Sequence, residues 1–174
     1  MKRIFAVLLA VVVSVAVLGC SSSKTGETSK GPEGELTKII DDIYEKKPVD
    51  LELETSPVDL SDKDALKMYT GLDSADLISE AVASEPMMSA QAYSLVLVRV
   101  KDEKDLKTVA EQMKNGINTR KWICVEANDL AVAGAGDVVM LFMIDEEWKD
   151  EITSEDMVSA FKELCGGEVS VLLK

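Results

Sequence analysis

SAQAYSLVLVRV, at residues 89–100, is the stretch of sequence that decides the fold. Four consecutive apolar side chains, Leu95–Val98, predict a strand that is buried on both faces, because successive side chains of a strand point to opposite sides. VVMLFMI, at residues 138–144, shows the same continuous apolar run. We therefore expect these two strands in the centre of a sheet that is covered on both faces.

Helices and strands alternate from residue 89 onward. Asp102 predicts the N-cap of a helix that ends near Gly116, and Thr153 with Asp156 predicts a capping box for a second helix. AGAGD, at residues 133–137, lies between two strands and predicts a hairpin turn, because a phosphate-binding loop would open a helix. The two remaining strands are a bent or interrupted one over residues 122–125 and 130–133, and a final one over residues 169–173.

This element order, β-α-β-β-α-β, predicts an α+β fold with a ferredoxin-like antiparallel sheet. In that arrangement the first and third strands are central, and these are the two strands that lack polar alternation here. Helices on one face alone would leave the other face of the sheet bare. We expect an N-terminal helix over residues 35–47 and the segment around residues 62–70 to cover that second face.

The region before residue 89 carries its own signals. An apolar stripe at helical spacing runs from Leu36 to Tyr44, and the proline that follows ends this helix. Ser61 and Asp64 predict a capping box for a short helix that stops at Gly71. Residues 49–57 predict a short edge strand or an extended linker, and residues 77–83 predict a further strand.

The first twenty residues, MKRIFAVLLAVVVSVAVLGC, have the pattern of a secretory signal peptide: a charged start, an apolar run and small residues at the end. The run is shorter than the ~20 residues that a membrane-spanning helix needs. VLGC, at residues 17–20, resembles the lipobox of bacterial lipoproteins, in which the cysteine receives a diacylglyceryl group and becomes the first residue. Leu18 is bulkier than the residue usual there, and an ordinary cleaved signal with an incidental cysteine is the alternative.

These signals divide the chain into three parts. Residues 1–19 are predicted as a lipoprotein signal peptide. Residues 20–34 are predicted as the lipidated Cys20 followed by a flexible tether, because the segment is rich in Ser, Gly, Thr and Lys and has no large apolar residue. Residues 35–174 are predicted as a single α+β domain of ordinary size.

Charge and composition exclude several classes of function. The full chain has a net charge of −13, and removal of residues 1–19 would leave 17 basic against 32 acidic side chains, a net charge of −15. Such a chain will not bind nucleic acid or anionic lipid by charge, so contact with a membrane must depend on the lipid at Cys20. The chain contains no histidine, which removes the commonest general base and histidine metal sites. We predict no cofactor, no metal and no catalytic residue.

Two cysteines remain beyond the anchor. Cys124 and Cys165 could form a disulfide in an oxidising compartment, or remain as two buried, unpaired thiols. The ferredoxin-like topology would place them at opposite ends of the sheet, which argues against the disulfide.

Clusters of charge offer the only other candidate sites. Two groups of acidic residues lack the pattern of a calcium loop, and we expect both to face solvent. The first is Asp59, Asp62 and Asp64, and the second is the run from Asp145 to Glu151. TRKW, at residues 119–122, is unusual in so acidic a chain. Its side chains Arg120, Lys121 and Trp122 predict either a contact patch for an acidic partner or glycan, or a structural role in which both basic residues pair with carboxylates and the indole covers the core.

SAQAYSLVLVRV, TRKWICVEA and GDVVMLFMI are similar to the corresponding segments of a family of small lipoproteins from clostridia-type Gram-positive bacteria, catalogued as a domain of unknown function. The resemblance spans residues 36–144, and the lipobox and tether match as well. It implies a lipid-anchored protein on the extracytoplasmic face of the cell membrane, and it carries over no site residue.

Two functional hypotheses follow. The first is a noncatalytic binding or accessory module of the cell envelope, attached to the membrane through Cys20 and directed at an envelope protein or glycan. The alternative is a hydrolase of envelope polymers that uses two carboxylates about 5–9.5 Å apart in a cleft.

Overall fold

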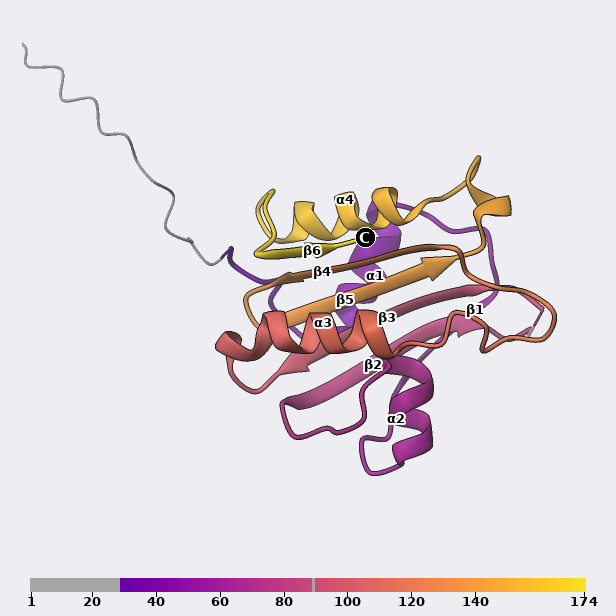
Figure 1. Ribbon diagram of the computed structural model, residues 1–174. Coiled ribbons are helices and arrows are strands. Elements are labelled where there is room, and N and C mark those ends of the chain that lie inside the picture. Colours follow the sequence, from indigo (N-terminus) through magenta and orange to yellow (C-terminus); the bar gives the residue numbers. More distant parts are fainter. Residues whose placement is uncertain (1–28, 89) are drawn as a thin grey trace, which may run out of the picture.

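The computed structural model describes residues 29–88 and 90–174, so the predicted signal peptide and Cys20 lie outside the described residues. One antiparallel sheet with helices on both faces forms the body of the protein (Figure 1). Its strands are β1 (Leu53–Pro57), β2 (Ile78–Pro86), β3 (Tyr93–Val100), β4 (Asp129–Ala135), β5 (Val138–Ile144) and β6 (Val171–Leu173). The α-helices are α1 (Leu36–Lys46), α2 (Lys63–Thr70), α3 (Leu106–Gly116) and α4 (Ser154–Leu164), and short 3-10 turns span Glu103–Asp105 and Glu146–Trp148.

The two apolar strands lie in the centre of the sheet, as the sequence predicts. The strand order is β1-β2-β3-β5-β4-β6, and β3 pairs with β5 from Tyr93↔Ile144 to Arg99↔Val138. Every residue of β5 is buried, and so is every residue of β3 except Arg99. The α+β class and the antiparallel sheet preceded by an N-terminal helix are confirmed.

The strand order departs from the ferredoxin-like arrangement. There the last strand pairs with the first strand of the β-α-β-β-α-β unit, which is β3 here, whereas β6 pairs with β4, through Val132↔Leu173 and its neighbours. The position beside β3 is occupied by β2. The second crossover, β5-α4-β6, therefore moves across the sheet in the same direction as the first, β3-α3-β4.

This difference decides which helix covers which face. Because β3 and β5 are antiparallel, two right-handed crossovers in the same direction must pass over opposite faces of the sheet. Accordingly, α4 packs with α1 on one face, around Phe142 and Phe161, and α3 packs with α2 on the other, around Leu141 and Met113 (Figure 1). The expectation that α1 and the segment around residues 62–70 share one face is wrong: each N-terminal helix joins one crossover helix.

The segment predicted as the first half of a bent strand forms no strand. Residues 122–125 lie in the loop between α3 and β4, which we call the 117–128 loop. Cys124 has a φ of 64°, in the left-handed region that interrupts extended backbone, and Ile123 is 67% exposed. The amide of Ala127 donates to the carbonyl of Thr119 at 2.9 Å, which closes the loop on itself.

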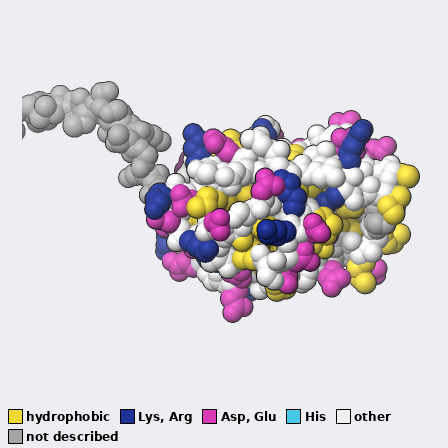
Figure 2. All heavy atoms as spheres, turned by 60° about the horizontal axis from the view of Figure 1, so that its bottom comes forward, with side chains coloured by type: hydrophobic (Ala, Val, Ile, Leu, Met, Phe, Trp, Pro, Cys, Tyr) yellow, Lys and Arg dark blue, Asp and Glu magenta, His cyan; other side chains and the backbone are white. Residues whose placement is uncertain are grey.

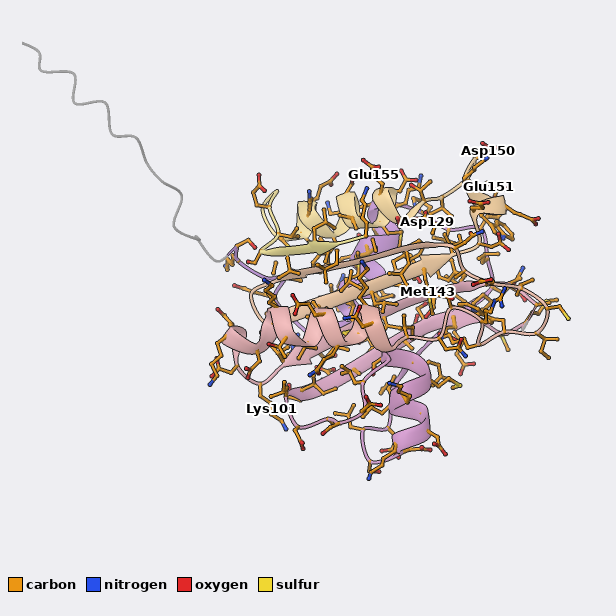
Figure 3. All side chains as sticks on the ribbon, viewed as in Figure 1. Lys101, Asp129, Met143, Asp150, Glu151 and Glu155 are labelled. Atoms are coloured by element: carbon orange, nitrogen blue, oxygen red, sulfur yellow. The ribbon has the colours of Figure 1, made fainter. Side chains whose placement is uncertain are left out.

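Side chains at helix ends attach the helices to the sheet. The predicted capping box of Thr153 and Asp156 is present at the start of α4. Asp129, at the start of β4, accepts a hydrogen bond of 2.7 Å from the amide of Ser154 and lies beside α4 in Figure 3. The N-cap of α2 is Asp62 and not Ser61, whose hydroxyl donates to Asp59 instead.

The last residues before α1 lie against the opposite end of the sheet from the 117–128 loop (Figure 1). Ser29 accepts a hydrogen bond of 2.9 Å from the amide of Gly136 in the β4–β5 hairpin. Gly31 passes so close that a Cβ on it would lie 2.5 Å from the carbonyl oxygen of Ala135. Arg99 donates to the carbonyl of Gly34 at 2.5 Å. Residues 29–34 of the predicted tether are therefore in contact with the domain.

The backbones of α2 and α3 approach each other closely at their C-terminal ends. A Cβ on Gly116 would lie 2.1 Å from the carbonyl oxygen of Gly71, and Gly71 itself has a φ of 77°. The 117–128 loop, which follows α3, contacts α2 through Lys121.

Gly116→Ala tests the contact between Gly116 and Gly71. Alanine at a helix glycine ordinarily adds about 0.5–1 kcal/mol of stability, but here we expect the free energy of unfolding to fall by roughly 1–3 kcal/mol, because backbone must move to admit the methyl group. Urea denaturation measures the change, and Asn115→Ala, at the exposed neighbouring position, is the matched control. A gain in stability from Gly116→Ala would contradict the contact.

Candidate functional site

The 117–128 loop carries the predicted patch, and Lys121 is its most buried charged side chain. The ammonium group of Lys121 forms an ion pair with the carboxylate of Glu85 at the end of β2. It also donates to the carbonyl of Met68 in α2, at 3.3 Å. The ammonium nitrogen also lies over the rings of Tyr69 and Trp122, 5.2 Å from each ring centroid. Lys121 thus joins the loop to both β2 and α2.

The electrostatics of this cluster follow from its burial. The side chain of Lys121 is 6% exposed, and this loss of solvent lowers its pKa, while the charge and hydrogen bond of Glu85 act in the opposite direction. Ser94, which is fully buried in β3, donates a hydrogen bond of 2.6 Å to Glu85. The Oε1 atom of Glu85 therefore accepts from both the ammonium group of Lys121 and the hydroxyl of Ser94, so the buried charge is paired and hydrogen-bonded.

A serine beside a lysine can act as a nucleophile and base in hydrolases, so the pair requires a geometric test. The hydroxyl of Ser94 is 3.5 Å from the ammonium nitrogen of Lys121, but it donates to Glu85 and has no exposed surface. No substrate can reach it. The cluster of Lys121, Glu85 and Ser94 is a buried polar lock between the loop and the sheet.

The other two residues of the predicted patch occupy different environments. Arg120 is 75% exposed, and its guanidinium is paired with Glu126 of the same loop at 2.6 Å. Trp122 is half-buried and packs against the core cluster on the α2–α3 face. The geometry agrees with the interpretation in which both basic residues pair with carboxylates. Sequence reasoning singled out the loop but missed Glu85, Ser94 and Tyr69. The only signal in the sequence was a lysine, Lys121, directly before an apolar run.

A second polar network lies on the other face of the sheet. The hydroxyl of Tyr93 donates to that of Tyr44 at 3.1 Å, and Tyr44 donates to Ser84 at 2.8 Å. Thr55 also donates to Ser84, at 2.9 Å. Burial raises the pKa of both tyrosines. These hydroxyls satisfy one another and tie α1 to β1, β2 and β3.

A polar hollow of about 600 Å³ lies between α2 and α3. Two carboxylates line it, and each already has a cationic partner: Asp73 pairs with Lys67 at 2.8 Å, and Glu111 pairs with Lys107 at 3.8 Å. The side chain of Asp73 is 90% exposed. The other residues that line the hollow are Lys67, Gly71, Ser74, Thr108, Gln112, Asn115 and Gly116.

The cysteines and the acidic runs do not form a site among the described residues. Cys124 is exposed and Cys165 is buried, and both are free thiols. Burial raises the pKa of Cys165 to about 12, so this thiol is not ionised near neutral pH. Asp150 and Glu151 lie at the outer tip of the connection before α4, in solvent (Figure 3). Within residues 29–88 and 90–174, no three acidic or cysteine side chains are grouped to hold a metal ion.

Fold and site together define an α+β protein whose buried charged cluster is a structural lock. Residues 49–122, from the approach to β1 as far as Trp122, match the family model described as Domain of unknown function (DUF4358). This match confirms the expected resemblance to an uncharacterised family. No curated protein and no solved structure matches the chain. Among the described helices, none is long and apolar enough to cross a membrane.

Lys121→Met tests the lock. We expect it to lower the free energy of unfolding by roughly 3 kcal/mol, because it leaves the carboxylate of Glu85, only 20% exposed, without its cation. Arg120→Met is the matched control, and should cost less than about 1 kcal/mol because the Arg120–Glu126 pair is in solvent.

The double variant Lys121→Met with Glu85→Gln should recover part of the loss, since no unpaired charge is then buried. Urea denaturation of the four proteins measures these differences. Equal costs for Lys121→Met and Arg120→Met would show that the buried pair does not hold the loop.

Proposed function

We propose that the protein is a lipid-anchored, extracytoplasmic binding or accessory module of the cell envelope, without catalytic activity. The observation that carries this proposal is the pairing of the buried polar side chains at the 117–128 loop. Lys121 is paired with Glu85, Ser94 donates to Glu85, and the cluster is closed to substrate. Such a cluster stabilises a surface loop. It is suited to presenting that loop to a partner.

The proposed anchor is Cys20. The charged start, the apolar run and the VLGC ending support it, and two acyl chains at ~0.8 kcal/mol per buried methylene hold a protein on a bilayer. The first described residues lie at the β4–β5 hairpin, at the other end of the strands from the 117–128 loop (Figure 1). An anchored chain would therefore direct the loop away from the bilayer.

Cys20→Ser tests the anchor. We expect the variant to move from the membrane fraction to the medium or the soluble fraction, because a serine hydroxyl does not receive the diacylglyceryl group. Cell fractionation with immunoblotting measures the distribution, and Cys124→Ser, which changes an exposed thiol of the domain, is the control and should stay with the membrane. A Cys20→Ser protein that still sediments with membranes would contradict the proposal.

The hollow between α2 and α3 is the specific observation that favours the alternative, a carboxylate-dependent hydrolase of envelope polymers. It is open, polar and lined by Asp73 and Glu111. Against this, both carboxylates are already paired with lysines and are largely exposed. A general acid in such enzymes is ordinarily held protonated by apolar surroundings.

The full-length protein and the variant Asp73→Asn with Glu111→Gln separate the two functions. Incubated with purified peptidoglycan or teichoic acid, both proteins should release no more soluble fragments than buffer does, because no acid–base pair is assembled. Chromatography of the released fragments measures this. Release by the unaltered protein that the double variant loses would establish the hydrolase and overturn the binding module.

A further inference from the structure

The exposed apolar side chains of the domain gather at the end where the 117–128 loop lies. Among the described residues, five large hydrophobic side chains are exposed, and Leu172 alone lies elsewhere. The other four we call the distal patch. Its members are Met68 on α2, Met87 and Met88 after β2, and Ile123 in the loop, with exposed fractions from 45% to 73%. Hydrophobic side chains cluster at the right-hand end of Figure 2.

The polar lock joins the three segments that carry these side chains. Lys121 donates to the carbonyl of Met68 and pairs with Glu85, which is two residues before Met87. Ile123 follows Lys121 by two residues. The buried ion pair therefore fixes the segments that carry the distal patch at one end of the molecule, and exposed apolar side chains gathered in this way mark interaction sites. Methionine side chains adapt their shape to the surface they meet.

Exposed acidic residues lie at the same end of the sheet as the distal patch. Glu52 accepts a backbone hydrogen bond of 3.4 Å from the amide of Met87, and both Glu52 and Glu54 are exposed. Glu146 and Glu147, also exposed, follow β5 at the same end of the sheet. The basic residues of the loop do not offset them, because Arg120 and Lys121 are each already paired with a carboxylate.

This charge selects the occupant. A second copy of the chain would bring two such acidic ends together, and a chain with a net charge of −13 is repelled by anionic lipid. A partner surface with basic residues around an apolar centre is complementary to the distal patch and its acidic neighbours.

We propose that the distal patch docks a segment of another envelope protein in which apolar side chains are flanked by lysine or arginine. The proposal rests on the proposed function, since it identifies the contact surface of the binding module and the chemistry of its partner.

Photo-crosslinking of the full-length chain in intact cells tests it. Benzoylphenylalanine replaces Met87 or Ile123 in the distal patch, and Gln112 or Leu172 outside it. We expect the first two positions to crosslink the same protein through a segment that contains apolar residues and several Lys or Arg. With the probe at Met87, Met68→Ser with Ile123→Ser should lower the yield about tenfold, and Leu172→Ser should leave it unchanged. Matching urea midpoints show that each variant is folded.

Other products overturn the proposal. Crosslinks from Met87 and Ile123 to a second copy of this chain, to lipid or to an acidic segment would each do so, and so would a yield that the Met68 and Ile123 double variant does not lower. Products from Gln112 or Leu172 alone would reject the distal patch and leave the binding module standing. The absence of a product at all four positions would reject both.

Discussion

The pairing of β3 with β5 is the constraint on which the rest of the structure depends. Both strands are apolar on two faces, so the sheet must be covered on two faces to be stable. Four helices meet this requirement in pairs, α1 with α4 and α2 with α3. The position of α2 follows from that arrangement, and α2 in turn provides a surface that the 117–128 loop contacts.

The parts of the fold that the sequence predicts are those that local chemistry decides. The continuous apolar runs place the central strands, and the Thr153–Asp156 box places the start of α4 because both partners lie within one turn. The strand order is a different kind of property. Whether the last strand pairs with β3 or β4 depends on whether β2 already occupies the edge of β3, and that pairing joins residues far apart in the chain.

The candidate site shows the same division. TRKW stands out because basic residues are unusual in this chain, but whether they are exposed or paired depends on Glu85, which is 36 positions before Lys121. The error over residues 122–125 has a related cause. Trp122, Ile123 and Val125 have strand-like composition, but the lock at Lys121 and the left-handed backbone at Cys124 hold the segment as a loop, with Ile123 in solvent.

The entry of the chain at the β4–β5 hairpin has a mechanical consequence. The contacts of Ser29 and Gly31 with that hairpin lie at one end of the strands, and the 117–128 loop lies at the other. Tension between these two ends would act parallel to the strands. The hydrogen bonds between antiparallel strands, which run across the strands, would then be loaded together in shear instead of breaking one after another. A domain held from both ends in this way would resist stretching along the direction of its strands.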